Sequence, residues 1–151
     1  MKRDKYDITF SDLVRLRANY TCEECGNYFP EGERGGLDCS HFVGRARLSG
    51  RYHPDNASAA CRGCHQKLSS NPIAFADRIK EFLGDRFDFM KIATNQVIKL
   101  DRAEKDAIRR HHLSEITRLT EMRKQGHMGR IEVTTPPVLE LRLREAVAGK
   151  Q

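Results

Sequence analysis

Two short stretches, Cys22-Glu-Glu-Cys25-Gly26 and Cys61-Arg-Gly-Cys64-His65, decide how this chain folds. Each contains a Cys-x-x-Cys pair, a spacing that lets two thiolates bind one metal ion, and four thiolates complete a closed tetrahedral zinc site. Residues 20–71 hold all five cysteines and few long apolar runs, so this region needs a staple other than a large core. The sequence therefore predicts a structural Zn²⁺ bound by Cys22, Cys25, Cys61 and Cys64.

Other interpretations of the cysteines stay open. The two pairs are unrelated buried thiols in the simplest alternative. Cys61-Arg-Gly-Cys64-His65 also matches the pattern of covalent haem attachment, but haem leaves Cys22 and Cys25 unexplained and needs an export signal, which residues 1–10 do not resemble. A colourless purified protein would exclude haem. The fifth cysteine, Cys39, is expected to be a small buried residue, with metal ligation as the alternative.

Length and composition limit the class of protein. The chain has 151 residues, which predicts one domain, and 38% of them are hydrophobic, which is too many for wholesale disorder. No stretch approaches the roughly 18 apolar residues of a membrane span, so we expect no membrane association. Lys and Arg number 27 against 21 Asp and Glu, a net charge of +6 that modestly favours polyanionic partners. The odd number of cysteines fits a disulfide framework poorly, and a cytosolic chain does not normally hold cysteines as disulfides, so the cytoplasm is the expected location.

Capping residues and apolar spacing predict the helices. Ser11 is expected to start a helix over 12–19, Asn71 a helix over 73–83 that Gly84 closes, and Asp101 a long helix to about Gln125. For 87–100 a helix is favoured over a strand, and the tail is expected to be helical or mobile. The predicted organisation is a zinc-containing core over 1–75, a helical extension over 76–129 and a tail over 130–151.

The insert between the two cysteine pairs is 35 residues long, more than a purely structural zinc ribbon needs. It carries Asp38 and His41 at one end and Asn56 near the other, and His65 directly follows the last cysteine of the second pair. This pattern resembles the HNH, or ββα-metal, nucleases, whose three name-giving residues would be His41, Asn56 and His65.

The closest resemblance is to the NinG (Rap) recombination proteins of lambdoid phages. It rests on Cys39-Ser-His-Phe-Val-Gly-Arg45, Asp55-Asn-Ala57 and Cys61-x-x-Cys-His65, and it covers roughly residues 11–75. The order of motifs also parallels phage endonuclease VII, in which zinc knuckles surround an Asp-x-Asp-His motif. The resemblance implies an α+β fold, with a zinc-stapled ββα-metal core and a helical C-terminal extension. It also implies that the protein acts in the bacterial host cell of a phage or prophage.

The same resemblance implies a metal-dependent DNA endonuclease acting on branched or single-stranded recombination intermediates. His41 would be the general base, Asn56 would hold its loop, and Asp38 and His65 would bind Mg²⁺ or Mn²⁺. Alternating side chains of a strand would put Asp38 and His41 on opposite faces, so a turn or bulge is needed to reconcile them. Simpler roles stay open: His65 as a spare zinc ligand, Asn56 as a turn residue and His41 as a surface residue.

Basic residues follow His41 in a glycine-bounded loop. Arg45, Arg47 and Arg51 are predicted to contact DNA phosphates, with a solvated basic loop as the alternative. A junction-cutting enzyme would also imply a homodimer and recombination proteins as partners. Two other functions remain: an HNH endonuclease with a restriction, homing or recombinase-dependent role, and a non-catalytic zinc-containing DNA-binding protein. His53 is expected to be a second ligand or contact, with solvent exposure as the alternative, and His111 and His112 are expected to be surface and packing residues.

Overall fold

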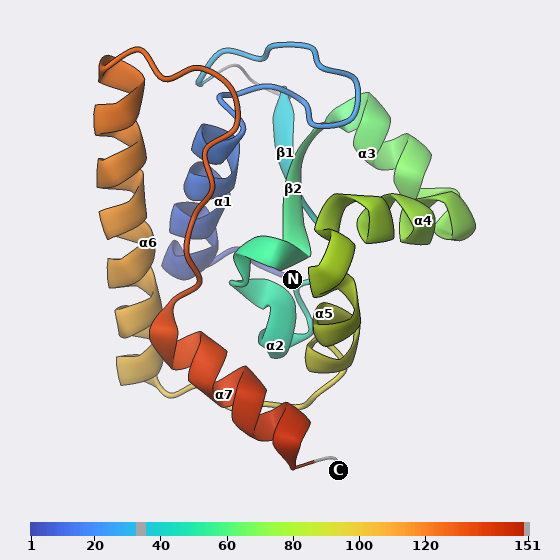
Figure 1. Ribbon diagram of the computed structural model, residues 1–151, viewed down its shortest axis with the longest axis vertical. Helices are drawn as coiled ribbons and strands as arrows, with labels where there is room; N and C mark the ends of the chain where they lie inside the picture. Colours follow the sequence, from blue (N-terminus) through green and yellow to red (C-terminus); the bar gives the residue numbers. More distant parts are fainter. Residues whose placement is uncertain (33–35, 150–151) are drawn as a thin grey trace.

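The computed structural model describes residues 1–32 and 36–149 (Figure 1). Its elements in chain order are α1 (Lys5–Arg17), β1 (Leu37–His41), α2 (Leu48–Arg51), the 3₁₀ turn η1 (Pro54–Asn56), β2 (Ala57–Cys61), α3 (Arg62–Ser69), α4 (Pro72–Leu83), the 3₁₀ turn η2 (Gly84–Arg86), α5 (Phe87–Ala93), α6 (Arg102–Lys124) and α7 (Pro137–Ala148). The described chain is therefore mostly helical with one small sheet.

The sheet is an antiparallel pair in which Leu37 lies opposite Cys61 and His41 opposite Ala57. The small side chains of β2, including Ala57 and Ala59, are fully buried, which lets α1 pack closely on the sheet. Helix α3 begins at the residue after β2. Strands β1 and β2 and helix α3 thus form a strand-strand-helix unit that begins in the insert and continues through the second cysteine pair. Strand β1 has a free edge because the sheet of the described residues has two strands.

Helix α1 starts earlier than the sequence analysis predicted. Asp4, not Ser11, is the N-cap: its carboxylate accepts the backbone N–H of Asp7 at 2.8 Å, and Asp7 in return accepts the backbone N–H of Asp4 at 2.9 Å. This reciprocal capping box satisfies two otherwise unpaired N–H groups. The prediction failed because Ser11 was read as a cap, whereas in the structure it is a buried residue within the helix.

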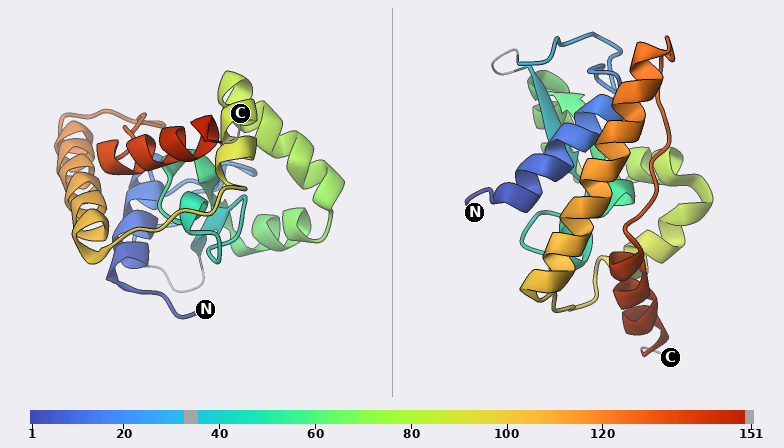
Figure 2. Two further views of the ribbon diagram at one scale, coloured as in Figure 1. Left: turned by 90° about the horizontal axis from the view of Figure 1, so that it is seen from below. Right: turned by 90° about the vertical axis from the view of Figure 1, so that its left-hand side faces the viewer.

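Helix α1 lies between the sheet and the long helix α6 (Figures 1 and 2). On one side, Phe10 and Val14 pack against the alanines of β2. On the other side, Leu13 packs against Leu119 of α6, together with Ile131 from the segment that follows α6. Burial of these apolar side chains on both of its sides holds α1 in a fixed position against the sheet and α6.

The predicted boundaries of α4 and α6 are confirmed. Asn71 caps α4 by accepting the N–H of Ala74, and Gly84, with a φ of 55°, follows its last residue. Asp101 caps α6, which continues to Lys124. In the region 87–100 the helix is confirmed only for Phe87–Ala93.

The tail contains the helix α7, which contributes Leu139 and Leu143 to a core shared with α5 and α6. Its burial, and not its local sequence pattern alone, explains why this segment is helical. Residues 150 and 151 of the predicted tail lie outside the described residues.

The α+β class predicted from the sequence is confirmed, and the cysteine-rich region lies where the sheet meets α3. Within 1–32 and 36–149, no helix combines the length and the apolar character needed to cross a bilayer.

Candidate metal centre and adjoining cleft

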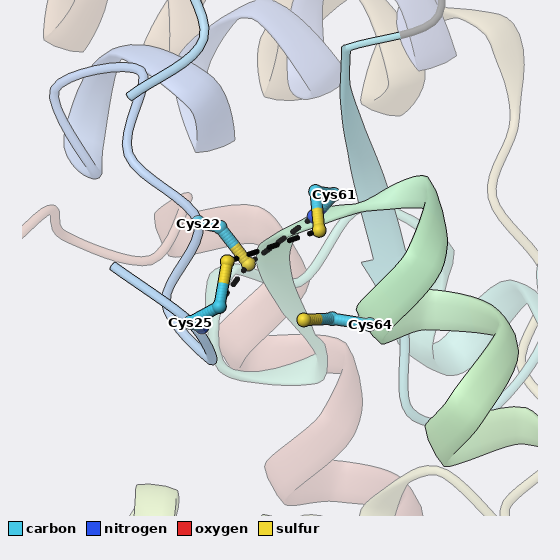
Figure 3. Close-up of side chains that lie close together, drawn as sticks. All are labelled: Cys22, Cys25, Cys61 and Cys64. Atoms are coloured by element: carbon cyan, nitrogen blue, oxygen red, sulfur yellow. Dashed lines mark hydrogen bonds between the residues drawn. The ribbon is translucent and has the colours of Figure 1, made fainter. Parts of the chain in front are cut away.

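The four predicted zinc ligands come together in the structure. Their sulfur atoms all lie within 4.8 Å of one another, and Figure 3 shows the side chains of the two pairs facing each other. Cys22 and Cys25 come from the loop after α1, Cys61 ends β2, and Cys64 lies in the first turn of α3. The site can hold a structural metal such as Zn²⁺.

The sulfur separations fit the proposed ion. The Sγ atoms of Cys25 and Cys61 are 3.9 Å apart, and a tetrahedral zinc ion with Zn–S bonds of about 2.3 Å requires about 3.8 Å between sulfurs. Disulfide bonds are absent from the described residues, and all five cysteines are free thiols. The donor set and this spacing therefore fit a closed structural site for a metal such as zinc.

The electrostatics of the cluster also favour a cation. Burial opposes ionisation of Cys22, but the backbone N–H groups of Cys25 and Cys61 point at its sulfur and lower its pKa to about 7. Burial and the neighbouring thiols raise the pKa of Cys64 to about 12. Four thiolates cannot coexist at neutral pH without a positive charge among them, so metal binding here must release protons.

Two acidic residues inside the first Cys-x-x-Cys pair anchor the metal site to the rest of the fold. Glu23 accepts the N–H of Ala59 in β2 at 2.9 Å and pairs with Arg130 at 2.8 Å. Glu24 pairs with Arg78 of α4 at 2.8 Å. The sequence analysis did not assign a role to these carboxylates, because their basic partners are more than 50 residues away along the chain.

A cleft of about 370 Å³ opens beside the metal site. Three of the residues predicted to be functional line it: Asp38 and His41 of β1, and His65 of α3. The Oδ2 atom of Asp38 lies 3.3 Å from Nδ1 of His65. Residues of α1 and α3 line the same cleft. The cleft therefore spans the free edge of β1, where side chains from both faces of the strand can reach it. No bulge is needed to bring Asp38 and His41 to one cleft.

The imidazole of His41 is held by one hydrogen bond. Its Nε2 lies 2.9 Å from the carbonyl oxygen of Arg51. A carbonyl oxygen only accepts, so Nε2 carries the proton and Nδ1 has a free lone pair. Burial lowers the pKa of His41, and the positive charge of Arg45 lowers it further, while the Arg51 carbonyl acts in the opposite direction. His41 is therefore neutral at pH 7.

Asn56 holds the two ends of the loop that follows His41. The side chain is buried; its Oδ1 accepts the N–H of Val43 at 3.0 Å, and its Nδ2 donates to the carbonyls of Val43 and Gly50 at 2.9 and 3.0 Å. Gly50 is required for this approach, because a Cβ atom there would lie 2.6 Å from Nδ2 of Asn56. The sequence analysis predicted that Asn56 holds the loop of His41, but it assigned no role to Gly50.

The three arginines predicted to bind DNA lie in different environments. Arg45 lines the cleft, donates to the carbonyl of Met1 at 2.9 Å and lies 3.7 Å from Asp7. Arg47 is exposed and precedes α2. Arg51 is engaged by the buried carboxylate of Asp7 at 2.6 and 2.9 Å. Contacts of these arginines with DNA stay predictions.

The other histidines and Cys39 lie as follows. His53 is buried, not exposed, and its Nδ1 accepts the N–H of Asp55. His112 is fully buried and packs against Phe10, whereas His111 contacts Thr134. Cys39 lies outside the four-cysteine cluster, and burial raises its pKa to about 11.

Compared with known proteins, the chain matches no family model, no curated protein and no solved structure.

Proposed function

We propose that this protein is a metal-dependent DNA endonuclease of the HNH type. The observation that supports the proposal most directly is one cleft containing Asp38, His41 and His65, in which the first and last of these are 3.3 Å apart and the lone pair of His41 Nδ1 is free. Asp38 and His41 lie on β1 and His65 on α3, and β1, β2 and α3 follow one another in the strand-strand-helix order that the resemblance implies.

The residues fit the hydrolysis of a phosphodiester bond. Asp38 offers carboxylate oxygens and His65 a ring nitrogen, a donor pair that suits Mg²⁺ or Mn²⁺. When bound, the cation would supply positive charge to the phosphate and to the departing 3′ oxygen. Nδ1 of neutral His41 takes a proton from a water molecule, whose oxygen forms the new bond to phosphorus as the bond to the 3′ oxygen breaks, and the departing 3′ oxygen takes up a proton from solvent. The resemblance implies 5′-phosphate and 3′-hydroxyl ends.

Asn56 acts in this proposal as a positioning residue. Its three hydrogen bonds fix the start and the end of the segment from Val43 to Gly50. The Arg51 carbonyl that orients His41 follows this segment directly. A fixed loop keeps Nδ1 of His41 in one orientation toward the attacking water, and this orientation is what a rigid scaffold contributes to phosphodiester hydrolysis.

Finer parts of the proposal rest on the resemblance alone. They are the preference for branched or single-stranded recombination intermediates, the homodimer, recombination proteins as partners and the bacterial host cell as the location. The structural metal of the four-cysteine site is proposed to be Zn²⁺.

The test is cleavage of a labelled four-way junction beside a matched linear duplex and a single strand, with Mg²⁺ or Mn²⁺. We expect metal-dependent cutting, lost in His41→Ala and retained in His127→Ala, a matched change at an exposed histidine that does not line the cleft. Stronger cutting of the junction supports the recombination role, and equal cutting of all substrates supports another HNH role. Tight DNA binding with no cutting by the wild-type protein would favour the non-catalytic zinc-containing DNA-binding protein.

A further inference from the structure

A second hollow of about 430 Å³ adjoins the candidate cleft. The two hollows share Arg3, Arg15 and Asp38, and the second one reaches Arg62. Together they form one groove that passes the proposed catalytic residues. We refer to its stretch between Arg3, Arg15 and Arg62 as the arginine track.

The three arginines reach the track from separate parts of the chain. Arg3 precedes α1, Arg15 lies near the end of α1, and Arg62 is the first residue of α3. Because the elements that carry them are fixed by the core and by the cysteine cluster, their charges converge only in the folded protein. This explains why a search for basic runs in the sequence does not find them.

Arg3 is held in place although it lies near the chain terminus. On one side of it, Asp4 caps α1 and accepts a hydrogen bond from the hydroxyl of Tyr52 at 3.2 Å. On the other side, the carbonyl of Met1 accepts a hydrogen bond from Arg45 at 2.9 Å. Anchoring at both ends of residues 1–4 positions Arg3 over the groove, and this lowers the entropy that a ligand contact would cost.

The charges of the arginine track are accessible to a ligand. The side chain of Arg15 is 22% exposed and lines both hollows; it pairs with Asp12 at 2.9 Å, but the side chain of Asp12 is 55% exposed, and an ion pair with so exposed a partner contributes little. Arg3 and Arg62 are exposed, and neither forms an ion pair within the described residues. Arg51, by contrast, is engaged by buried Asp7.

The acidic groups of the groove do not cancel this charge. Among the described residues that line the groove, the acidic ones are Asp12 and Glu31, which are exposed, and Asp38, which the proposed function assigns to the divalent cation. Arg45 adds a fourth positive charge at the His41 side of the cleft. A chain of phosphates is the ligand that suits a groove in which guanidinium groups lie on both sides of a cation site.

We propose that Arg3, Arg15 and Arg62 bind the phosphate backbone of the DNA strand that is cut, along the groove that leads from the His41 cleft past Asp38 to Arg62. The inference rests on the proposed function for the identity of the ligand. It moves the main phosphate contacts from the loop of Arg47 and Arg51 to the arginine track.

The experiment measures DNA binding without added divalent cation over a series of salt concentrations. Arg3→Gln, Arg15→Gln and Arg62→Gln are compared with Arg144→Gln, a change at an exposed arginine of α7, which lies on the opposite side of the molecule from the N-terminus (Figure 2, right). Each track variant should weaken binding severalfold and reduce the slope of log K against log salt by about 0.7 to 0.9, the release of roughly one counterion. Arg144→Gln should leave both unchanged, and Arg15→Lys should restore most of the slope. Zinc content and melting temperature, measured for each variant, establish that the fold is intact.

The outcomes separate this inference from the proposed function. Slopes equal to that of the wild type in all three folded track variants would overturn the arginine track, even if the protein cuts DNA. Reduced slopes in a protein that cuts no substrate with Mg²⁺ or Mn²⁺ would support the track and reject the nuclease. A wild-type protein that does not bind DNA would overturn both.

Discussion

Nε2 of His41 lies 2.9 Å from the carbonyl oxygen of Arg51, ten residues away in the chain. The side chain of Arg51 is in turn bound by Asp7 of α1. One continuous set of contacts therefore runs from a buried carboxylate in the first helix to the proposed general base. The orientation of His41 depends on this set, because a ring nitrogen that donates to a fixed carbonyl leaves the other nitrogen aimed in one direction.

The first prediction concerns the pH dependence of cleavage. Burial lowers the pKa of His41 below the 6.5 of a free imidazole. The base is active when neutral, so the rate should be level through pH 7 and fall only below pH 6.5 as the imidazole gains a proton. Cleavage rates between pH 5 and 8, measured with Mg²⁺ and with Mn²⁺, check this. A limb above pH 7 that moves when the metal is changed would instead assign the titration to a metal-bound water.

The second prediction concerns Asp7. Its carboxylate is buried, and although burial acts in the opposite direction, hydrogen bonds from Arg51 and Asp4 lower its pKa to about 2. Asp7→Asn should cost about 2 to 3 kcal/mol in the free energy of unfolding, because it removes the nearer and buried partner of Arg51 and leaves only the carboxylate of Asp4 at 3.5 Å. The pKa is lower in the folded state than in the unfolded state, so the stabilisation is present above pH 4 and is lost as the pH falls toward 2.

Urea unfolding of Asp7→Asn beside Asp12→Asn measures this. Asp12 makes an exposed pair with Arg15, so its substitution should change the free energy of unfolding by less than about 0.5 kcal/mol. Equal effects of the two substitutions would show that the Asp7–Arg51 pair does not hold the fold.

The third prediction concerns Asn56. In Asn56→Asp, one carboxylate oxygen can still accept the N–H of Val43, but the other faces the carbonyls of Val43 and Gly50, to which the amide donated. Facing acceptors without a proton between them should destabilise the protein by about 2 kcal/mol or more and slow cleavage. Asn95→Asp, at an exposed asparagine that also donates to a carbonyl, is the control for melting temperature and rate. Normal cleavage by a folded Asn56→Asp protein would remove the positioning role.

The fourth prediction concerns the cysteine cluster. Purified protein should contain one zinc per chain, and Cys22→Ser should lose it and lower the melting temperature by roughly 10 °C or more, since a structural zinc contributes directly to folding. Cys39→Ala, at a thiol outside the cluster, should retain the metal. Elemental analysis and thermal unfolding measure both effects. Full zinc occupancy in Cys22→Ser would contradict the four-cysteine site.

The fifth prediction concerns acid stability. Burial lowers the pKa of His112 to about 3, well below its value of about 6.5 in the unfolded chain. The folded state excludes the proton, so stability falls as the pH drops below 6.5, by about 1.4 kcal/mol per pH unit for this residue. His112→Phe keeps an aromatic ring beside Phe10. The free energy of unfolding of the wild-type protein should fall between pH 7 and pH 5.5, and this variant should make that fall about 1 kcal/mol smaller. An unchanged difference would show that His112 is not responsible.

Local signals in the sequence predicted a large part of this structure. The Cys-x-x-Cys pairs predicted which four sulfurs meet, because each pair is brought together by its own turn and a shared metal needs both. Two helix starts were predicted from Asn71 and Asp101, because the side chain of a capping residue accepts a backbone N–H no more than three residues away. The motif spacing also named Asp38, His41 and His65, which the structure places at one cleft.

Tertiary structure alone decided the rest, and the physical reason is separation along the chain. Asp7 and Arg51 are 44 residues apart, and nothing in either local sequence indicates that they meet. The burial of His112 and the helix α7 depend on packing against elements elsewhere in the chain. The arginine track likewise joins residues that precede α1, lie within it and begin α3. The sequence by itself determined the candidate metal ligands and the chemical groups of the cleft. The fold determined which charges stay accessible for the proposed substrate, because ion pairing and burial are decided by contacts between distant segments.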